Sequence, residues 1–141
     1  MSEEKNKQVF RRLIDEGFNK GNLDALDEIC APNFFEHQDG IVPPTIDGLK
    51  GAIISLRTPF PDLFLTIEEI TANGDKTWAR ITGCGTHRGA FMGRPPTDKS
   101  FAITVIDICR FENNKIVEHW GVADRLSLIA QLGLLPQTPQ N

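Results

Sequence analysis

The sequence offers carboxyl and imidazole groups, but no phenol, for acid–base chemistry. It contains nineteen acidic residues and three histidines, His37, His87 and His119, and it has no tyrosine. A phenolic hydroxyl that donates a hydrogen bond to a substrate is therefore excluded. The histidines are too far apart in the sequence to place two metal ligands on one helix face. We therefore expect no bound metal, and chemistry carried by carboxylates and imidazoles.

Asp107 is a candidate because it stands in an otherwise apolar row. The residues that share its face of a predicted strand, at alternate positions, are Phe101, Ile103, Val105, Cys109 and Phe111. A carboxylate in such surroundings must find a partner or remain protonated, so Asp107 is a candidate for binding a substrate. The alternative is a structural ion pair with Arg80 of the neighbouring strand. Arg80 is therefore included among the candidate ligand-binding residues.

His119 and Asp124 are the candidates for proton transfer, near the end of the last predicted strand. If Glu118 faces solvent, His119 faces the interior, and Asp124, five residues on, points to the opposite face of an unbroken strand. A glycine within a strand often marks a bulge, and we predict one near Gly121 that brings Asp124 to the side of His119. Two alternatives stay open: Asp124 is also a natural helix N-cap, and His119 is equally well explained as a core histidine.

Three further residues lie where a ligand would enter the fold. His37 and His87 stand in the segments FFEHQDG and GTHRG, where each either contacts a ligand or lies exposed in a loop. Trp120 follows His119 and would supply an apolar neighbour for Asp124. We include His37, His87 and Trp120 among the candidate substrate-binding residues.

Two apolar periodicities define the elements that must position these residues. Helical spacing predicts helices over about 9–18 and 23–30, a third between Asp47, its expected N-cap, and Pro59, and a fourth over 125–132. Alternating spacing predicts strands over 34–37, 63–72, 76–87, 100–112 and 115–124. Hairpin turns are expected at Asn73-Gly74 and Asn113-Asn114. The pattern shows no linker and predicts a single domain over residues 1–141.

The order of these elements, helices first and antiparallel hairpins second, predicts an α+β fold. In such an arrangement a curved, mostly antiparallel sheet packs its concave face on the N-terminal helices and can enclose a pocket. The opposite face of the longest strand carries Ala102, Thr104, Ile106 and Ile108, a row too apolar for comfortable exposure. We therefore expect a homodimer or homotetramer formed through the outer face of the sheet.

Net charge and hydropathy limit the classes of molecule that this protein is expected to bind. The formal net charge is −4, and no run of basic residues exceeds the pair Arg11-Arg12, which argues against nucleic acids and anionic membranes. The first residues, MSEEKNKQ, lack an apolar targeting core, and no stretch approaches the roughly 20 apolar residues of a membrane span. We expect a cytoplasmic protein that binds a small molecule.

Four segments carry a resemblance to a known family. They are FNKGNLDALDEICAPNFFEH, FPDLFLTIEEI, GTHRGAFMGRPPT and DICRFENNKIVEHWGVADRLSLIAQLG. In this order they resemble the SnoaL-like polyketide cyclases, within the nuclear transport factor 2-like superfamily. The likeness extends from about Asn6 to Pro136, and several matched segments are more specific than one short motif.

The resemblance implies a cone-shaped α+β barrel and a reaction without a cofactor. That reaction is an intramolecular aldol condensation closing the last ring of an aromatic polyketide, so the implied ligand is a small apolar or aromatic polycarbonyl compound. The family's acid–base aspartate matches Asp124, and this favours catalysis over capping for that residue. His119 would then orient the Asp124 carboxylate or bind a substrate carbonyl.

Two other functions remain open for the same fold. An epoxide hydrolase or hydratase, resembling limonene epoxide hydrolase, would use Asp107, Arg80 and Asp124 to hold a water molecule, although the tyrosine and asparagine of that family have no match here. A binding module would hold a small apolar ligand and catalyse nothing. Convergence of Asp124 and His119 on one cavity would support an enzyme, whereas Asp124 turned away as a helix cap would support binding.

Overall fold

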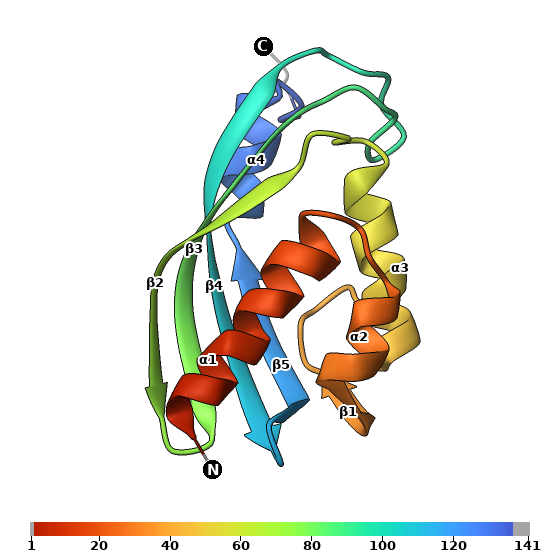
Figure 1. Cartoon of the computed structure of the whole chain (residues 1–141). Helices are drawn as coiled ribbons and strands as arrows, with labels where there is room; N and C mark the ends of the chain where they lie inside the picture. The colour runs from red at the N-terminus through yellow and green to blue at the C-terminus, as the bar shows by residue number, and fades with distance from the viewer. Residues whose placement is uncertain (1, 137–141) are drawn as a thin grey trace.

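The computed structural model describes residues 2–136, and its helices and strands follow the predicted order (Figure 1). The predicted single domain also includes residues 1 and 137–141, which lie outside the described part. The helical elements are α1 (Glu3–Arg12), the π-helix η1 (Leu13–Phe18), α2 (Asp24–Ile29), α3 (Ile46–Arg57) and α4 (Arg125–Gln131). The strands are β1 (Cys30–Glu36), β2 (Phe64–Asn73), β3 (Lys76–Thr86), β4 (Ser100–Glu112) and β5 (Lys115–Ala123).

The five strands form one curved sheet in the order β1-β5-β4-β3-β2. All neighbouring pairs are antiparallel except β1 and β5, which run parallel. Helices α1, α2 and α3 cover one face of the sheet, and α4 lies near the end of the molecule away from α2 (Figure 1). The predicted α+β fold, with a mostly antiparallel sheet curved around N-terminal helices, is confirmed, and the curved sheet stays open.

Capping and burial explain where the first and third helices begin. Ser2 accepts a hydrogen bond from the Lys5 N–H at the start of α1, earlier than the predicted start near residue 9, because polar residues form the first turns. Phe10 is fully buried under the sheet. The N-cap of α3 is Thr45, whose hydroxyl accepts from the Gly48 N–H at 3.3 Å. The predicted Asp47 cap is wrong, because Asp47 lies inside the first turn.

The core has two parts along the sheet. The larger part lies between α1, α2, α3 and the sheet and includes Phe10, Leu26, Ile53 and Phe111. The smaller part lies at the α4 end and comprises Phe60, Leu63, Phe101, Ile103, Leu128 and Leu132. None of the helices in residues 2–136 has the length and apolar content needed to span a membrane.

Strand β5 alternates regularly across the region that carries the candidate residues. Its pairing with β4 runs without interruption from Val105↔Ala123 to Arg110↔Glu118, and the register shifts only beyond Arg110, near the hairpin turn. The predicted bulge near Gly121 is therefore wrong. Because alternate residues of a strand share a face, His119 and Gly121 point inward, and Glu118 and Trp120 point outward.

Candidate functional site

A buried group of three ionisable side chains occupies the inner face of the sheet. His119 of β5 lies between Glu36 of β1 and Asp107 of β4. Its Nδ1 is 2.6 Å from Glu36 Oε1, and its Nε2 is 3.1 Å from Asp107 Oδ1. The side chains of His119, Glu36 and Asp107 are 3%, 0% and 7% exposed. The His119 imidazole thus has a carboxylate at each nitrogen and little contact with water.

The two carboxylates determine the charge of the imidazole. Burial alone lowers the pKa of His119, but the charges and hydrogen bonds of Asp107 and Glu36 outweigh that effect and raise the pKa to about 10. At neutral pH His119 is therefore an imidazolium that donates one hydrogen bond to Glu36 and one to Asp107. A metal ion would find no free nitrogen on this ring, and residues 2–136 contain no cluster of ligands suited to a metal.

Strand pairing brings these three residues together from distant parts of the sequence. The parallel pairing of β1 with β5 places Glu36 opposite His119. The antiparallel pairing of β4 with β5 places Asp107 opposite Gly121, the next inward position after His119. A Cβ on Gly121 would lie 2.7 Å from Asp107 Oδ1 and 2.9 Å from His119 Cε1. Glycine at this position therefore provides the space in which Asp107 and His119 meet.

Asp107 and His119 both line a cavity of about 510 Å³ between the sheet, α3 and the start of α4. The lining is mainly apolar and includes Phe18, Leu56, Phe60, Leu65, Phe101 and Val105. The remaining polar or charged side chains in the lining are Gln38, Asp39, Ser55 and Arg125. The site is thus an apolar cavity with one acid–base cluster set into its sheet wall, which suits a largely apolar ligand.

Asp124 lies outside this arrangement. Its carboxylate accepts a hydrogen bond from the Ser127 N–H at 3.1 Å and caps α4. The side chain is exposed, and Asp124 is not among the residues that line the cavity. The expected convergence with His119 does not occur, because β5 is regular at Gly121 and the chain turns into α4 directly after Ala123. The capping alternative describes this residue.

Arg80 is also remote from the buried cluster. It points to the outer face of the sheet, where its Nε lies 3.0 Å from Glu69 Oε1. The alternative of an Arg80–Asp107 ion pair is wrong, because the cross-strand partner of Asp107 is Ala79, and Arg80 opposes Ile106. A shift of one position along a strand moves a side chain to the other face.

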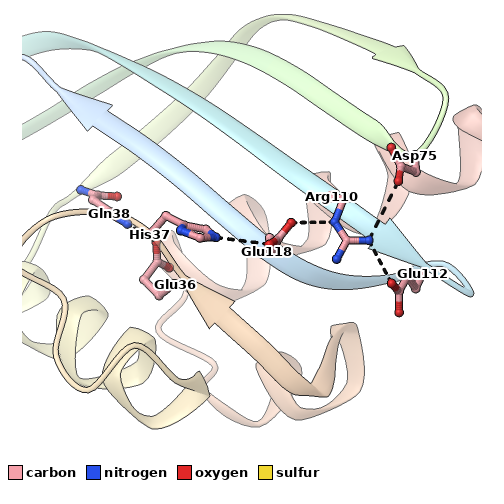
Figure 2. Close-up of polar contacts among 7 residues, drawn as sticks. All are labelled: Glu36, His37, Gln38, Asp75, Arg110, Glu112 and Glu118. Carbon is pink, nitrogen blue, oxygen red and sulfur yellow. Dashed lines mark hydrogen bonds and ion pairs between the residues drawn. The ribbon is translucent and has the colours of Figure 1, made fainter.

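His37 and Trp120 stack against each other on the outer face of the sheet. Their rings stack 4.6 Å apart and nearly parallel, with an interplanar angle of 3°. His37 Nε2 is 3.4 Å from Glu118 Oε1, and Glu118 in turn pairs with Arg110 at 2.6 Å (Figure 2). Neither His37 nor Trp120 lines the cavity, so the structure separates both from Asp107 and His119.

His87 is fully buried behind the cavity wall. Its Nδ1 accepts a hydrogen bond from the Thr97 N–H at 3.2 Å, and it lies 3.0 Å from the Thr97 hydroxyl oxygen. The ring packs against Phe60 and Phe91, which do line the cavity, but His87 itself does not. His87 therefore holds the loop after β3 to the body of the protein.

Of the seven candidates from the sequence, the structure brings together Asp107 and His119. Sequence reasoning missed Glu36 and Gln38. A signal for Glu36 was present, because it lies two residues after the buried Phe34 on the same short strand and so shares its inward face. Gln38 follows the end of β1, and no local pattern marks it as facing the cavity.

Comparison with known proteins agrees with the fold. Residues 8–132 match the family model of the SnoaL-like polyketide cyclases. The nogalonic acid methyl ester cyclase of Streptomyces nogalater is 28% identical over 123 residues, which are 82% of this chain and 89% of that protein.

Two solved structures show the same architecture. TsrD from Streptomyces laurentii superimposes with a TM-score of 0.86 at 28% identity, covering 96% of this chain and 99% of its own. IdmH, a putative polyketide cyclase from Streptomyces antibioticus, gives a TM-score of 0.81 at 34% identity and covers 91% of this chain and 98% of its own. The chain described here belongs to the SnoaL-like polyketide cyclase family.

Proposed function

We propose that this chain is a cyclase that closes a ring on a polycarbonyl substrate by an aldol-type reaction without a cofactor, with Asp107 as the acid–base group. One observation carries the proposal: the Asp107 carboxylate lies in the wall of an apolar cavity and is held there by the His119 imidazolium. Of the three buried side chains, that of Asp107 is the most exposed, at 7%, and it lines the cavity, as His119 does and Glu36 does not.

The reaction needs a single carboxylate that works twice. Asp107 takes a proton from a carbon flanked by carbonyl groups, and the C–H electron pair forms the C=C bond of an enolate while the carbonyl pair moves to oxygen. The enolate carbon then attacks a second carbonyl of the same substrate, and a C–C bond forms. The resulting alkoxide takes the proton back from Asp107. Every proton and electron pair is accounted for, and Asp107 ends as it began.

His119 and Glu36 act on Asp107 rather than on the substrate. The imidazolium holds Asp107 by a hydrogen bond at 3.1 Å, and Glu36 fixes the other imidazole nitrogen at 2.6 Å. Glu36 is itself held by the Gln38 N–H at 2.9 Å. This support orients the carboxylate before the substrate binds, which is how positioned groups lower a barrier.

The assignment of Asp107 departs from the expectation that Asp124 is the acid–base group. The Asp124 carboxylate is engaged as the cap of α4 and is exposed to solvent. A base in bulk water gains nothing from an apolar cavity, whereas Asp107 lies in its wall. We therefore assign proton transfer to Asp107 and a structural role to Asp124.

Matched variants of the two aspartates test the assignment. Nogalonic acid methyl ester, the compound for which the Streptomyces nogalater relative is named, is the first substrate to try, followed by related polycarbonyl esters. Asp107→Asn should lower kcat by about 10²–10⁴-fold, and Asp124→Asn should stay within about threefold of the wild type. The opposite pattern would return the role to Asp124. Tight binding of these esters with no turnover would show a binding module instead.

The epoxide hydrolase alternative loses support from the position of Arg80. That reaction was expected to use Asp107, Arg80 and Asp124 around one water molecule, but Arg80 pairs with Glu69 on the outer face. The three side chains therefore do not meet, and ring closure remains the better proposal.

The homodimer or homotetramer and the cytoplasmic location remain predictions from the sequence. The outer face of the sheet exposes Trp78, Ile106 and Val122, at 46%, 43% and 71%. A second copy of the chain would cover this apolar face. Light scattering should give at least twice the 15.7 kDa chain mass, and a monomer mass would exclude the assembly.

A further inference from the structure

Proton removal by Asp107 would create a negative charge on a substrate oxygen inside an apolar cavity. Such an oxyanion needs a hydrogen-bond donor that is already in place. His119 cannot supply it, because both of its nitrogens are bound, one to Glu36 and one to Asp107. A tyrosine cannot supply it either, because the chain has none. We therefore looked for the donor among the other side chains of the cavity lining.

Three lining side chains still have donors to offer: Gln38, Ser55 and Arg125. Ser55 on α3 and Arg125 at the start of α4 are exposed to solvent, whereas Gln38 is half-buried. Within residues 2–136, the Gln38 side chain forms no hydrogen bond with another protein group at normal distance, although its backbone N–H does. Its carboxamide is therefore free to bind a ligand.

Gln38 also lies beside the proposed base. A Cβ on Gly121 would clash with the Gln38 side-chain oxygen and with Asp107 Oδ1. The Gln38 carboxamide and the Asp107 carboxylate thus lie close together over Gly121, and the gap between them is too small even for a methyl group. Both side chains also line the cavity, so a carbonyl group held in the cavity in front of them would have its α-hydrogen near Asp107 and its oxygen near Gln38.

The backbone of Gln38 is anchored to the buried cluster. Its N–H donates to Glu36 Oε1 at 2.9 Å, the same oxygen that accepts from His119. Figure 2 shows the Gln38 side chain just beyond the end of β1, extending away from those of Glu36 and His37. The hydrogen bonds that hold His119 in place therefore also fix the starting point of the Gln38 side chain.

We propose that the Gln38 carboxamide binds the oxyanion in the ring-closing reaction. The carboxamide atom that faces Gly121 is Oε1, so the carboxamide would turn about its last bond to present Nε2. Its Nε2–H would then donate to the carbonyl oxygen next to the carbon that Asp107 deprotonates, and it keeps its proton throughout. This inference rests on the proposed function. It defines the substrate as one with a carbonyl oxygen directly beside the acidic carbon, and it makes Gln38 a catalytic residue that touches the reacting atoms.

Kinetics of Gln38→Leu and Gln38→Glu test the role. Gln38→Leu should lower kcat by about 10²–10³-fold, with KM changed less than about threefold. The control is His37→Gln at the neighbouring surface position, whose kcat and KM should equal those of the wild type. Gln38→Glu should be inactive at pH 8 and recover activity as the pH falls, because a protonated carboxyl can donate again. A merely structural residue would not give that recovery. Turnover by Gln38→Leu within threefold of the wild type would overturn the inference.

A binding assay keeps the test independent of turnover. Naphthalene and 2-naphthol have the same ring system, and only 2-naphthol has an oxygen that can accept from Gln38. Fluorescence titration should show that Gln38→Leu weakens the binding of 2-naphthol at least tenfold and leaves the binding of naphthalene unchanged. Equal losses for both compounds would mean a damaged cavity and would overturn the inference. An inactive Asp107→Asn beside a fully active Gln38→Leu would refute the oxyanion role alone, and a fully active Asp107→Asn would refute the proposed function.

Discussion

The end of β1, the residue that follows it, and β5 carry two histidine–glutamate pairs, one on each face of the sheet and built from adjacent residues. On the inner face His119 Nδ1 lies 2.6 Å from Glu36, and the two side chains are 3% and 0% exposed. On the outer face His37 Nε2 lies 3.4 Å from Glu118, and the side chains are 31% and 27% exposed. The residue types are the same, and only the surroundings differ.

The surroundings decide what each pair can do. Burial makes the inner charges depend on one another, and the pKa of His119 rises to about 10. The pKa of Glu118 is lowered mainly by its hydrogen bond to Arg110 and less by His37. Arg110 also reaches Glu112 at 2.9 Å and Asp75 at 4.0 Å (Figure 2). The outer pair is part of a solvated ion network, whereas the inner pair has fixed geometry and fixed charge.

Replacing each histidine by glutamine should give the largest difference between the faces. His119→Gln leaves the Glu36 and Asp107 carboxylates buried without a cation, and such a loss typically costs about 3–5 kcal/mol of unfolding free energy. His37→Gln removes one member of a solvated pair and should cost less than about 1 kcal/mol. Urea denaturation at pH 7 measures both values. Equal losses for His119→Gln and His37→Gln at pH 7 would show that burial does not separate the two pairs.

The pH dependence of stability should show the inner pair directly. The pKa of His119 is about 10 in the folded protein and 6.5 in its ordinary state. The folded protein therefore keeps a proton on His119 that the unfolded chain gives up. The stability gained from this proton is complete below about pH 6.5 and is lost as the pH rises toward 10. Unfolding free energy should fall by up to about 1.4 kcal/mol per pH unit from pH 6.5 to 8.5.

Two variants isolate this slope. His119→Gln should lack it, and His37→Gln should retain it. The slope is measured only up to about pH 8.5, because cysteine thiols ionise above that pH. Burial raises the pKa of Cys30 and Cys109 in the folded state, so these thiols would add a slope of their own at higher pH. A wild-type profile that is flat from pH 6.5 to 8.5 would contradict the charged state of His119.

The space at Gly121 should be the next most sensitive feature of the inner face. Gly121→Ala places a methyl group against Gln38, Asp107 and His119, and such overpacking costs about 1–3 kcal/mol. Gly51→Ala is the matched control, because nothing lies within 4 Å of its Cβ position in α3, and alanine there should add about 0.5–1 kcal/mol. Thermal or urea unfolding measures the stability of both variants. A Gly121→Ala variant as stable as the wild type would mean that the side chains around Gly121 can accommodate a methyl group.

Local patterns predicted most of the fold. The strands from β2 to β5 lie within about two residues of their predicted ends, because alternating apolar residues and the turns at 73–74 and 113–114 are signals within a short segment. The start of β1 was predicted four residues too late. Cys30 continues the apolar stripe of α2, but its pairing with Ile116 of β5 draws it into the sheet, and no short segment contains that information.

The same limit applies to the site. The alternation of apolar residues along each strand predicted that His119 and Asp107 point to the inner face, because this pattern lies within the strand itself. It could not give their partners. Glu36 meets His119 through a pairing across 83 positions, and the guess of Arg80 failed by one position in register. Orientation is local information, whereas partnership depends on how the sheet is assembled.

Removing the charge of Glu118, the outer carboxylate, should have the smallest effect of these substitutions and tests most strictly whether the two faces act separately. Glu118→Gln removes the charge that pairs with Arg110 and His37. A solvated ion pair contributes about 0–1 kcal/mol, so the loss in unfolding free energy should stay below about 1 kcal/mol and vanish in 1 M salt, where the screening length is about 3 Å. Turnover should be unchanged, because the Glu118 side chain points away from the cavity. A loss above about 2 kcal/mol, or a fall in kcat, would mean that the outer network helps to position His119, the next residue of β5, and the two faces would then work as one site.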